Sequence, residues 1–216
     1  VAQIRGRCRM ILLTGYDDNM AEIGELTSAR MRVYAERHGL GFECVRDYHD
    51  RTHPSWQKAG HIIKVMEDSL FDRVLWLDAD TVITNMDTPP PTHQLGLHVS
   101  RDWGSDSTEP NSFSLGNFLA CVDSVRLWAD LDFHEFIWGN KPLWEQSCIR
   151  QLWEDNEWVR NLIKVHPRRV FNAVPGDMVG PEDISEVMEP WEPGDWLCHL
   201  TWMPNEERVR RFHELV

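Results

Sequence analysis

Two aspartates separated by a single residue, Asp78 and Asp80, follow the apolar run Val74–Leu77. The carboxyl end of a buried strand opens onto the crevice in which α/β proteins bind ligands, so both carboxylates are expected there. Such a pair can hold a divalent cation that bridges to an anionic ligand. The chain contains 18 Asp, and a chance copy of the pattern occurs at Asp130 and Asp132, where a helical pattern directs the side chains to different faces. The first pair is therefore the candidate metal and phosphate site.

A histidine near the end of the chain completes this candidate site. His199 closes the apolar run Trp196–Cys198, directly after a Gly-Asp turn. One imidazole and two carboxylates make a mixed nitrogen and oxygen ligand set, which suits Mn²⁺ with diphosphate oxygens in the remaining positions. The alternative is a buried histidine that bonds to the backbone.

Two classes of enzyme place a D-x-D motif at a strand end. In haloacid-dehalogenase-like phosphatases the pattern is D-x-D-x-T, as over Asp78–Thr81, and the first Asp is the phosphoryl nucleophile. GT-A glycosyltransferases use the motif to hold a nucleoside diphosphate sugar through Mn²⁺ or Mg²⁺. The phosphatase motif usually opens its fold, whereas two strand–helix units precede Asp78, and the late acidic motif of a phosphatase ends here in His199. Both differences favour the glycosyltransferase.

The elements that must position these residues alternate between apolar strand-like runs and helical patterns, which is typical of an α/β fold with a largely parallel sheet. Strands are predicted over residues 9–14, 42–46, 73–77, 95–100 and 196–200, with short strands near 165 and over 168–174. Helices are predicted over 21–38, 54–70, 123–138 and 143–156, and from 205 onward. The polar segment 101–111 is predicted to be a mobile loop.

Composition narrows the class of protein. The chain is 42% hydrophobic and 26% charged, as in folded globular proteins. It carries 22 Lys+Arg and 35 Asp+Glu, a net charge of −13, which argues against nucleic-acid or anionic membrane partners. No apolar run approaches the roughly 20 residues of a membrane span. Five scattered cysteines without a CxxC pair indicate reduced thiols, hence a cytoplasmic or other reducing compartment, with a trimmed Golgi-lumen domain as the alternative.

Six motifs in order resemble glycosyltransferase family 34, the α-galactosyltransferases and xyloglucan xylosyltransferases, and related bacterial or viral GT-A enzymes. The motifs are YAERHG at 34–39, WQK at 56–58, WLDADTVITN at 76–85, LGNFL at 115–119, WEQ at 144–146 and GDWLCHL at 194–200. Two positions depart from the family pattern: Ser114 replaces an Asn, and the segment 202–204 lacks a Gly and a Lys. Arg208 is the candidate replacement for that Lys as a phosphate clamp.

The resemblance implies a single GT-A domain over 1–216, with a mainly parallel Rossmann-like central sheet flanked by helices. Residues 1–86 are expected to form the nucleotide-binding half and 87–216 the acceptor and catalytic half. The donor is expected to be a UDP-sugar, the acceptor a glycan or other hydroxyl compound, the cofactor Mn²⁺ or Mg²⁺, and the transfer retaining. Further domains of a longer protein are compatible with this sequence, which begins at Val1.

The resemblance also assigns roles to residues. The expected metal ligands are Asp78, Asp80 and His199. The expected donor-binding residues are Thr14 and Tyr16 at the base, Lys58 at phosphate or ribose, and Asp78, Ala79, Asp80 and Asn117. Glu145 and Gln146 are expected to face the transferred sugar. Glu145 is the candidate nucleophile or electrostatic stabiliser at the anomeric carbon, with an exposed helix glutamate as the alternative. A degenerate, non-catalytic module that binds sugar or nucleotide is the second functional hypothesis.

The chain contains 11 tryptophans, and five of them can be assigned to two groups. Trp76 and Trp128 have the apolar neighbours of core residues. Trp103, Trp191 and Trp202 are candidates for stacking on acceptor sugar rings, because an aromatic face with a polar edge suits such rings. The arginine clusters at 168–169 and 208–211 are interpreted as solvated surface.

Overall fold

The computed structural model describes residues 9–48, 53–67, 71–102, 112–138, 143–178 and 190–216, the side chains of 135–138 excepted. The strands are β1 (Met10–Gly15), β2 (Gly41–Val45), β3 (Arg73–Leu77), β4 (Thr81–Ile83), β5 (Leu97–Arg101), β6 (Phe113–Cys121), β7 (Ile163–His166) and β8 (Leu197–His199). The α-helices are α1 (Ala21–His38), α2 (Pro54–Glu67), α3 (Val125–Trp138), α4 (Trp144–Asp155), α5 (Glu157–Leu162) and α6 (Asn205–Leu215).

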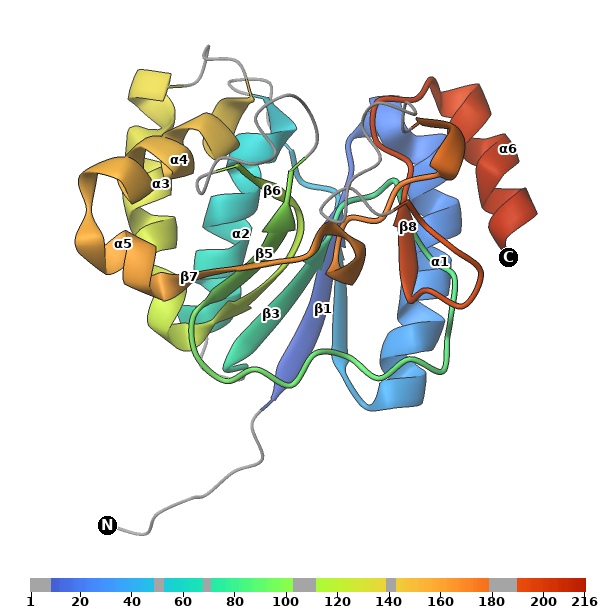
Figure 1. Cartoon of the computed structure of the whole chain (residues 1–216), viewed down its shortest axis with the longest axis horizontal. Helices are drawn as coiled ribbons and strands as arrows, with labels where there is room; N and C mark the ends of the chain where they lie inside the picture. Colours follow the sequence, from blue (N-terminus) through green and yellow to red (C-terminus); the bar gives the residue numbers. More distant parts are fainter. Residues whose placement is uncertain (1–8, 49–52, 68–70, 103–111, 139–142, 179–189) are drawn as a thin grey trace, which may run out of the picture.

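The described strands form a mixed, mainly parallel sheet between two groups of helices. Its order is β2-β1-β3-β6-β5-β7, and β4 pairs with β8 in a separate small sheet. The pairs β1–β2, β1–β3 and β5–β7 are parallel, whereas β6 runs antiparallel to both neighbours. Figure 1 shows α2 to α5 on one side of the sheet and α1 with α6 on the other. This architecture confirms the predicted α/β class.

Alternation along the strands divides the core between the two faces of the sheet. On β3, Val74 and Trp76 pack with α2 and α3, whereas Leu75 and Leu77 pack with α1. Both sets of side chains are buried, as expected for a central strand covered on both faces. The sheet is thus held rigidly up to Leu77, immediately before the D-x-D motif.

Several predicted elements agree closely with the structure. α1 begins and ends where predicted, at Ala21 and His38, and Gly39 ends it in the left-handed conformation with φ of 66°. β3 also has the predicted bounds, and Trp76 and Trp128 are buried. The predicted loop 101–111 lies outside the described residues apart from Arg101, which ends β5, and Asp102.

The central strand β6 was not predicted, because Gly116 and Asn117 interrupt its apolar pattern and are both poor strand formers.

The predicted strand over 168–174 is wrong. A short 3₁₀ helix, Arg168–Val170, occupies its first part, and the backbone there bonds elsewhere: Phe171 N donates to Ser100 Oγ, and Ala173 O accepts from His199 N. α5 and β4 were also missed, since both are short.

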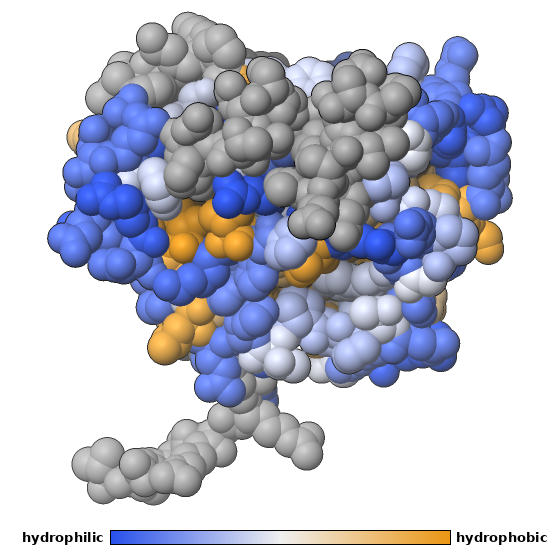
Figure 2. Space-filling view, viewed as in Figure 1, coloured by the Kyte–Doolittle hydropathy of each residue, from blue (hydrophilic) through white to orange (hydrophobic). Residues whose placement is uncertain are grey.

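The surface of the face seen in Figure 2 is largely hydrophilic, with small hydrophobic areas between polar ones. This agrees with the charged composition of the chain. Within the described ranges, none of the helices combines the length and the apolar character that crossing a membrane requires.

Candidate functional site

The strand–loop–strand segment that follows β3 brings the three predicted metal ligands together. Asp78 and Asp80 lie between β3 and β4, and the antiparallel pairing of β4 with β8 places Thr81 opposite His199. Leu200 N also donates to the carbonyl of Asp80 at 2.9 Å. Residues about 120 positions apart in the chain are therefore neighbours because two short strands pair.

The ligand atoms of these three side chains lie within 4.8 Å of one another. His199 Nε2 is 3.1 Å from Asp80 Oδ1 and 4.0 Å from Asp78 Oδ2. Asp80 and His199 are buried, whereas Asp78 is 30% exposed. The grouping predicted from the sequence is thus present, with Asp78 at the side that is open to solvent.

A hydrogen-bond chain through two asparagines fixes which nitrogen of His199 carries hydrogen. Asn117 Oδ1 accepts from Asp78 N at 2.9 Å and from Thr81 Oγ1 at 2.8 Å, so its amide nitrogen lies on the other side. That nitrogen donates to Asn172 Oδ1 at 3.1 Å. The same oxygen lies 3.0 Å from His199 Nδ1, which must therefore be the donor.

This tautomer leaves the lone pair of His199 Nε2 directed at the carboxylates. A lone pair 3.1 Å from Asp80 Oδ1 is a repulsive contact unless a proton or a cation lies between the two atoms. Orientation of a ligating histidine by a bond from its second nitrogen is the usual arrangement at metal sites. The donor set, one nitrogen and two carboxylates, fits Mn²⁺ or Mg²⁺ bound to an anionic ligand.

Asp80 is also held by a cation from the last helix. Arg208 Nη2 lies 3.2 Å from Asp80 Oδ2, and Arg208 Nε donates to Leu200 O at 3.0 Å. Burial raises the pKa of Asp80, but when a proton lies on His199 Nε2 the positive charges of His199 and Arg208 outweigh burial and lower this pKa overall. Arg208 therefore pairs with a predicted metal ligand and is not on a solvated surface; its role as a phosphate clamp stays a prediction.

A buried ion pair links the D-x-D motif to the start of α4. Lys58 Nζ lies 3.0 Å from Glu145 Oε1 and 3.5 Å from Asp78 Oδ1, and it donates to Leu115 O at 2.9 Å. Burial lowers the pKa of Lys58, but the two carboxylates outweigh burial and raise it overall. Burial raises the pKa of Glu145, and Lys58 partly offsets that rise.

Glu145 is thus a buried residue, and its interpretation as an exposed helix glutamate is wrong. Only 4% of it is exposed, and its second oxygen, Oε2, has no hydrogen-bond partner within the described part of the chain. A buried carboxylate with one unused oxygen is costly unless a ligand or a charge balances it. Lys58, in turn, is engaged by three acceptors, so its ammonium holds Asp78 and Glu145 in place.

We name Asp78, Asp80 and His199 the metal-binding cluster, after the role proposed for them. A cavity of about 540 Å³ is lined by Asp78 and His199 of this cluster and by the first residues of α4. Its walls include five of the predicted site residues: Lys58, Asp78, Glu145, Gln146 and His199. Trp202, predicted to bind acceptor, also lines it and is 70% exposed. A volume of this size is typical of pockets for small ligands.

Backbone strain in the described chain gathers at this cavity. Leu143, Trp144 and Trp202 have φ values of 61°, 43° and 61°, and they are the non-glycine residues with positive φ among those described. All three line the cavity. Such conformations cost about 1–3 kcal/mol each and concentrate at functional sites. Leu143 is the N-cap of α4 and Trp144 is its first residue, so this strained turn places Glu145 in the cavity wall.

The predicted residue Gln146 is held by two hydrogen bonds: its Oε1 accepts from Leu115 N, and its Nε2 donates to Asp102 Oδ2 at 2.7 Å. Sequence reasoning missed three cavity residues, namely Asp102, its partner Arg150, and Arg168. Arg168, interpreted from the sequence as solvated, is buried in the cavity wall, and burial lowers its pKa to about 10. Asp102 and Arg150 have no distinctive local pattern, and only Pro167 before Arg168 hinted at a turn.

Other predicted residues lie near the site but outside the cavity wall. Thr14 and Tyr16 are buried at the end of β1, where Arg46 packs over the Tyr16 ring at 4.0 Å. Ala79 is buried, and its carbonyl accepts from Thr27 at 2.6 Å. Asn117 is fully buried, and its amide bonds to Asp78 N, Thr81 Oγ1, Phe171 O and Asn172 Oδ1. Asn117 thus links Asp78 to Asn172, and its contact with the donor stays a prediction.

The remaining two tryptophans differ in what the structure says of them. Trp191 is partly buried in the cluster under α6, and its Nε1 donates to Thr84 Oγ1 at 3.1 Å. It does not line the cavity, so an acceptor contact there has no support. Trp103 lies outside the described residues.

Comparisons with known proteins agree with this geometry. No protein-family model matches the chain. An α-1,2-galactosyltransferase of Schizosaccharomyces pombe, itself uncharacterized, is 25% identical over an alignment 221 positions long, which covers 83% of this chain and 63% of the yeast protein. The chain thus spans just under two thirds of that relative.

Solved structures share the fold. A glycosyltransferase involved in glycosylation of the major capsid of PBCV-1 aligns with a TM-score of 0.72 and 16% identity, covering 95% of this chain and 99% of that one. The glycosyltransferase GlyE of Streptococcus pneumoniae TIGR4 aligns with a TM-score of 0.55 and 12% identity, covering 96% and 64%. Together, the sequence relative and the shared architecture confirm the predicted resemblance: this chain has the GT-A glycosyltransferase fold.

Proposed function

We propose that this protein transfers a sugar from a nucleotide-sugar donor to a hydroxyl group of a glycan acceptor, with a divalent cation and with retention of anomeric configuration. The observation that carries this proposal is the cavity itself. Asp78 and His199 of the metal-binding cluster line it together with the buried carboxylate Glu145. UDP is the proposed nucleotide and galactose the first sugar to test, in view of the yeast relative's name.

The bound cation would stabilise the charge that develops on the departing diphosphate. Side chains of the protein hold the proposed metal ligands in position. Asn172 and Asn117 orient His199 and Asp78, and Arg208 holds Asp80. An acidic protein of net charge −13 offers little general attraction to a diphosphate, so local positive groups are needed. Arg150 and Arg168 in the cavity wall supply such charge.

Glu145 is assigned to the anomeric carbon. Lys58 holds one of its oxygens, and the other has no partner in the described structure, so that oxygen remains for the sugar. As a nucleophile it would attack the anomeric carbon; as a stabiliser it would balance the positive charge that forms there. Both roles require an ionised carboxylate, which the adjacent ammonium of Lys58 favours.

The acceptor is proposed to enter beside Trp202. Its ring is 70% exposed at the cavity wall, and an exposed aromatic face suits the apolar face of a sugar ring. Trp144, which also lines the cavity, is instead stacked on His53 at 3.6 Å. Trp202 is therefore the better-placed candidate for acceptor contact.

A donor panel tests the proposal. The protein is incubated with UDP- and GDP-sugars, Mn²⁺ and oligosaccharide acceptors; nucleotide release is measured, and the anomeric configuration of the product is read by NMR. We expect release from one UDP-sugar and at least 100-fold less in Asp80→Asn. Phosphate release from simple monoesters would identify a phosphatase instead. Binding without turnover for every donor would identify a non-catalytic module.

A reducing compartment remains the proposed location. Its support is that no disulfide joins the four cysteines in the described ranges, Cys44, Cys121, Cys148 and Cys198. Quantifying free thiols in protein isolated without reductant tests this, and a disulfide in native material would oppose it.

A further inference from the structure

Three histidines outside the proposed active site gather at one edge of the main sheet. His98 lies on β5, His166 ends the edge strand β7, and His93 belongs to the connection between β4 and β5. Their ligand nitrogens all lie within 4.8 Å of one another. We name His93, His98 and His166 the three-histidine cluster.

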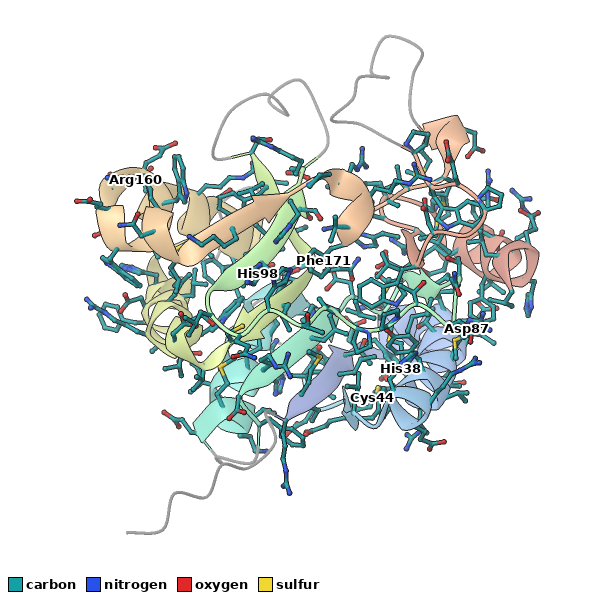
Figure 3. The ribbon with its side chains drawn as sticks, turned by 60° about the horizontal axis from the view of Figure 1, so that its bottom comes forward. His38, Cys44, Asp87, His98, Arg160 and Phe171 are labelled. Atoms are coloured by element: carbon teal, nitrogen blue, oxygen red, sulfur yellow. The ribbon has the colours of Figure 1, made fainter. Side chains whose placement is uncertain are left out.

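Strand alternation explains why these rings meet. Leu97 and Val99 of β5 face the core under α2 and α3, so His98 faces the opposite side of the sheet. β7 runs parallel to β5, with Ser100 opposite His166, which puts His166 on the same side as His98. The ring of Phe171 contacts His166 edge-on at 5.9 Å, and the ring of His98 lies 5.1 Å from that of His166; His98 and Phe171 are labelled in Figure 3.

The hydrogen bonds of His98 determine which of its nitrogens is available to a metal. His98 Nε2 lies 2.8 Å from Leu95 O, and a carbonyl only accepts, so Nε2 carries the hydrogen. The lone pair of neutral His98 is then on Nδ1, which lies 2.8 Å from His166 Nε2. A second nitrogen that donates to a backbone carbonyl is the typical support of a ligating histidine.

Burial in the cluster is graded from inside to outside. His98 is 5% exposed, His166 is half-buried and His93 is exposed, with its ring stacked 4.0 Å from that of His98. An ion can therefore reach the cluster from solvent, and His93 is free to turn toward it. Three nitrogens around Zn²⁺ lie about 3.4 Å apart, as tetrahedral angles and Zn–N distances of 2.0–2.1 Å require. The nitrogens of the cluster, now within 4.8 Å of one another, would have to reach this spacing, and the His93 ring would have to turn out of its stack on His98.

We propose that His93, His98 and His166 form a second metal site, which binds Zn²⁺ and is separate from the Asp78, Asp80 and His199 site. Three neutral imidazoles suit Zn²⁺ and its analogue Co²⁺ better than the harder Mn²⁺ or Mg²⁺. Water would occupy the remaining position. On binding, the hydrogen that His166 Nε2 shares with His98 moves to Nδ1 of His166, so His166 stays neutral.

Such an ion would fasten the sheet edge. It would join the connection that contains His93 to β5 and to β7, the last strand of the sheet order. The segment directly after His166 supplies Arg168, Asn172 and Val174 to the wall of the 540 Å³ cavity. The proposed ion therefore stabilises the base of that wall and takes no part in the chemistry.

Metal titration of the whole chain tests the proposal. Metal-free Asp80→Asn protein, whose other site is disabled, is titrated with Co²⁺ while visible absorption is recorded, and Zn²⁺ affinity is measured by competition. We expect one ion per chain, a spectrum typical of nitrogen ligands and displacement by Zn²⁺. Adding His93→Gln should weaken Zn²⁺ binding at least tenfold and remove the Zn²⁺-induced rise in melting temperature.

The controls keep the outcome readable. His93 is exposed, so His93→Gln should fold even if His98→Gln, which alters a buried ring, does not. His213→Gln changes an exposed histidine on α6, outside the cluster, and should leave Zn²⁺ affinity unchanged. Absence of Zn²⁺ binding in Asp80→Asn, or equal affinity with and without His93, would overturn the proposal. Neither result would bear on donor-dependent turnover by the wild-type chain.

Discussion

At the scale of single residues, Glu145 is the group whose chemistry can be tested most directly. Glu145→Gln keeps the shape of the side chain, and Lys58 keeps Asp78 and Leu115 O as partners. We expect turnover to fall about 100-fold or more, because one charged group at a transition state is commonly worth a few kcal/mol. UDP affinity should change little. Steady-state kinetics and calorimetric titration with UDP measure the two quantities.

The matched control for this change lies on the same helix. Glu154 is exposed on α4, and Glu154→Gln should retain wild-type turnover. If Glu145→Gln keeps more than about a third of wild-type turnover, Glu145 has no charge-dependent role. If it loses UDP affinity in proportion to turnover, Glu145 supports the nucleotide site instead.

Asn172 is a positioning residue, because it reaches the metal only through His199. Asn172→Leu removes the acceptor for His199 Nδ1 while keeping a similar volume. We expect Mn²⁺ affinity to fall about 10- to 100-fold, the usual cost of losing such a partner. Mn²⁺ binding, followed by electron paramagnetic resonance, is the direct readout. Asn172→Asp keeps an acceptor oxygen and should restore part of the affinity; equal loss in both variants would indicate a packing role alone.

At the scale of elements, β6 must approach β8 closely. A Cβ at Gly116 would lie 2.5 Å from His199 Cε1 and 3.0 Å from Asn172 Oδ1. Gly116→Ala should therefore displace His199 and weaken Mn²⁺ binding at least tenfold. Gly60→Ala on α2 is the control, since its Cβ would meet only Asp132 Oδ1, at 3.5 Å. It should bind Mn²⁺ normally and gain up to about 1 kcal/mol from helix propensity.

Thermal unfolding and the Mn²⁺ affinity distinguish the two glycine variants. Gly116→Ala that unfolds at the wild-type temperature but binds Mn²⁺ weakly would locate the effect at His199. Wild-type Mn²⁺ affinity in this variant would show that β6 and His199 can separate without consequence, contrary to the tight contact described.

At the scale of the whole molecule, ligand binding should couple to global stability. The proposed metal ligands come from the β3–β4 loop and from β8, and α6 holds Asp80 through Arg208. With Mn²⁺ present, UDP at about 100 times its dissociation constant should stabilise the fold by about 2.7 kcal/mol. For a chain of this size that raises the melting temperature by about 5–10 °C. Calorimetric scans with and without EDTA measure it.

Two variants bracket this stabilisation. Asp80→Asn should lose most of it, whereas Asp87→Asn, at an exposed aspartate of the surface pair with Arg37, should keep it. An equal rise of melting temperature in EDTA would mean that UDP binds without the metal.

The sequence by itself determined the local features of this protein. Apolar runs and the Gly39 stop defined α1 and β3, because local hydrophobic period and backbone preference act over a few residues. The D-x-D motif and the late histidine also predicted the metal-binding cluster that the structure brings together. Such chemistry is readable when the residue types are few and their strands are recognisable.

Only the tertiary structure decided the remainder, because it depends on contacts between distant residues. β6 is a strand despite Gly116 and Asn117 because its neighbours β3 and β5 bond to it along both edges. Glu145 became a buried partner of Lys58, and Asn172 became the support of His199, through pairs 87 and 27 residues apart in sequence. Neither pattern has a local signature. Packing and hydrogen-bond satisfaction across the folded chain assign these roles.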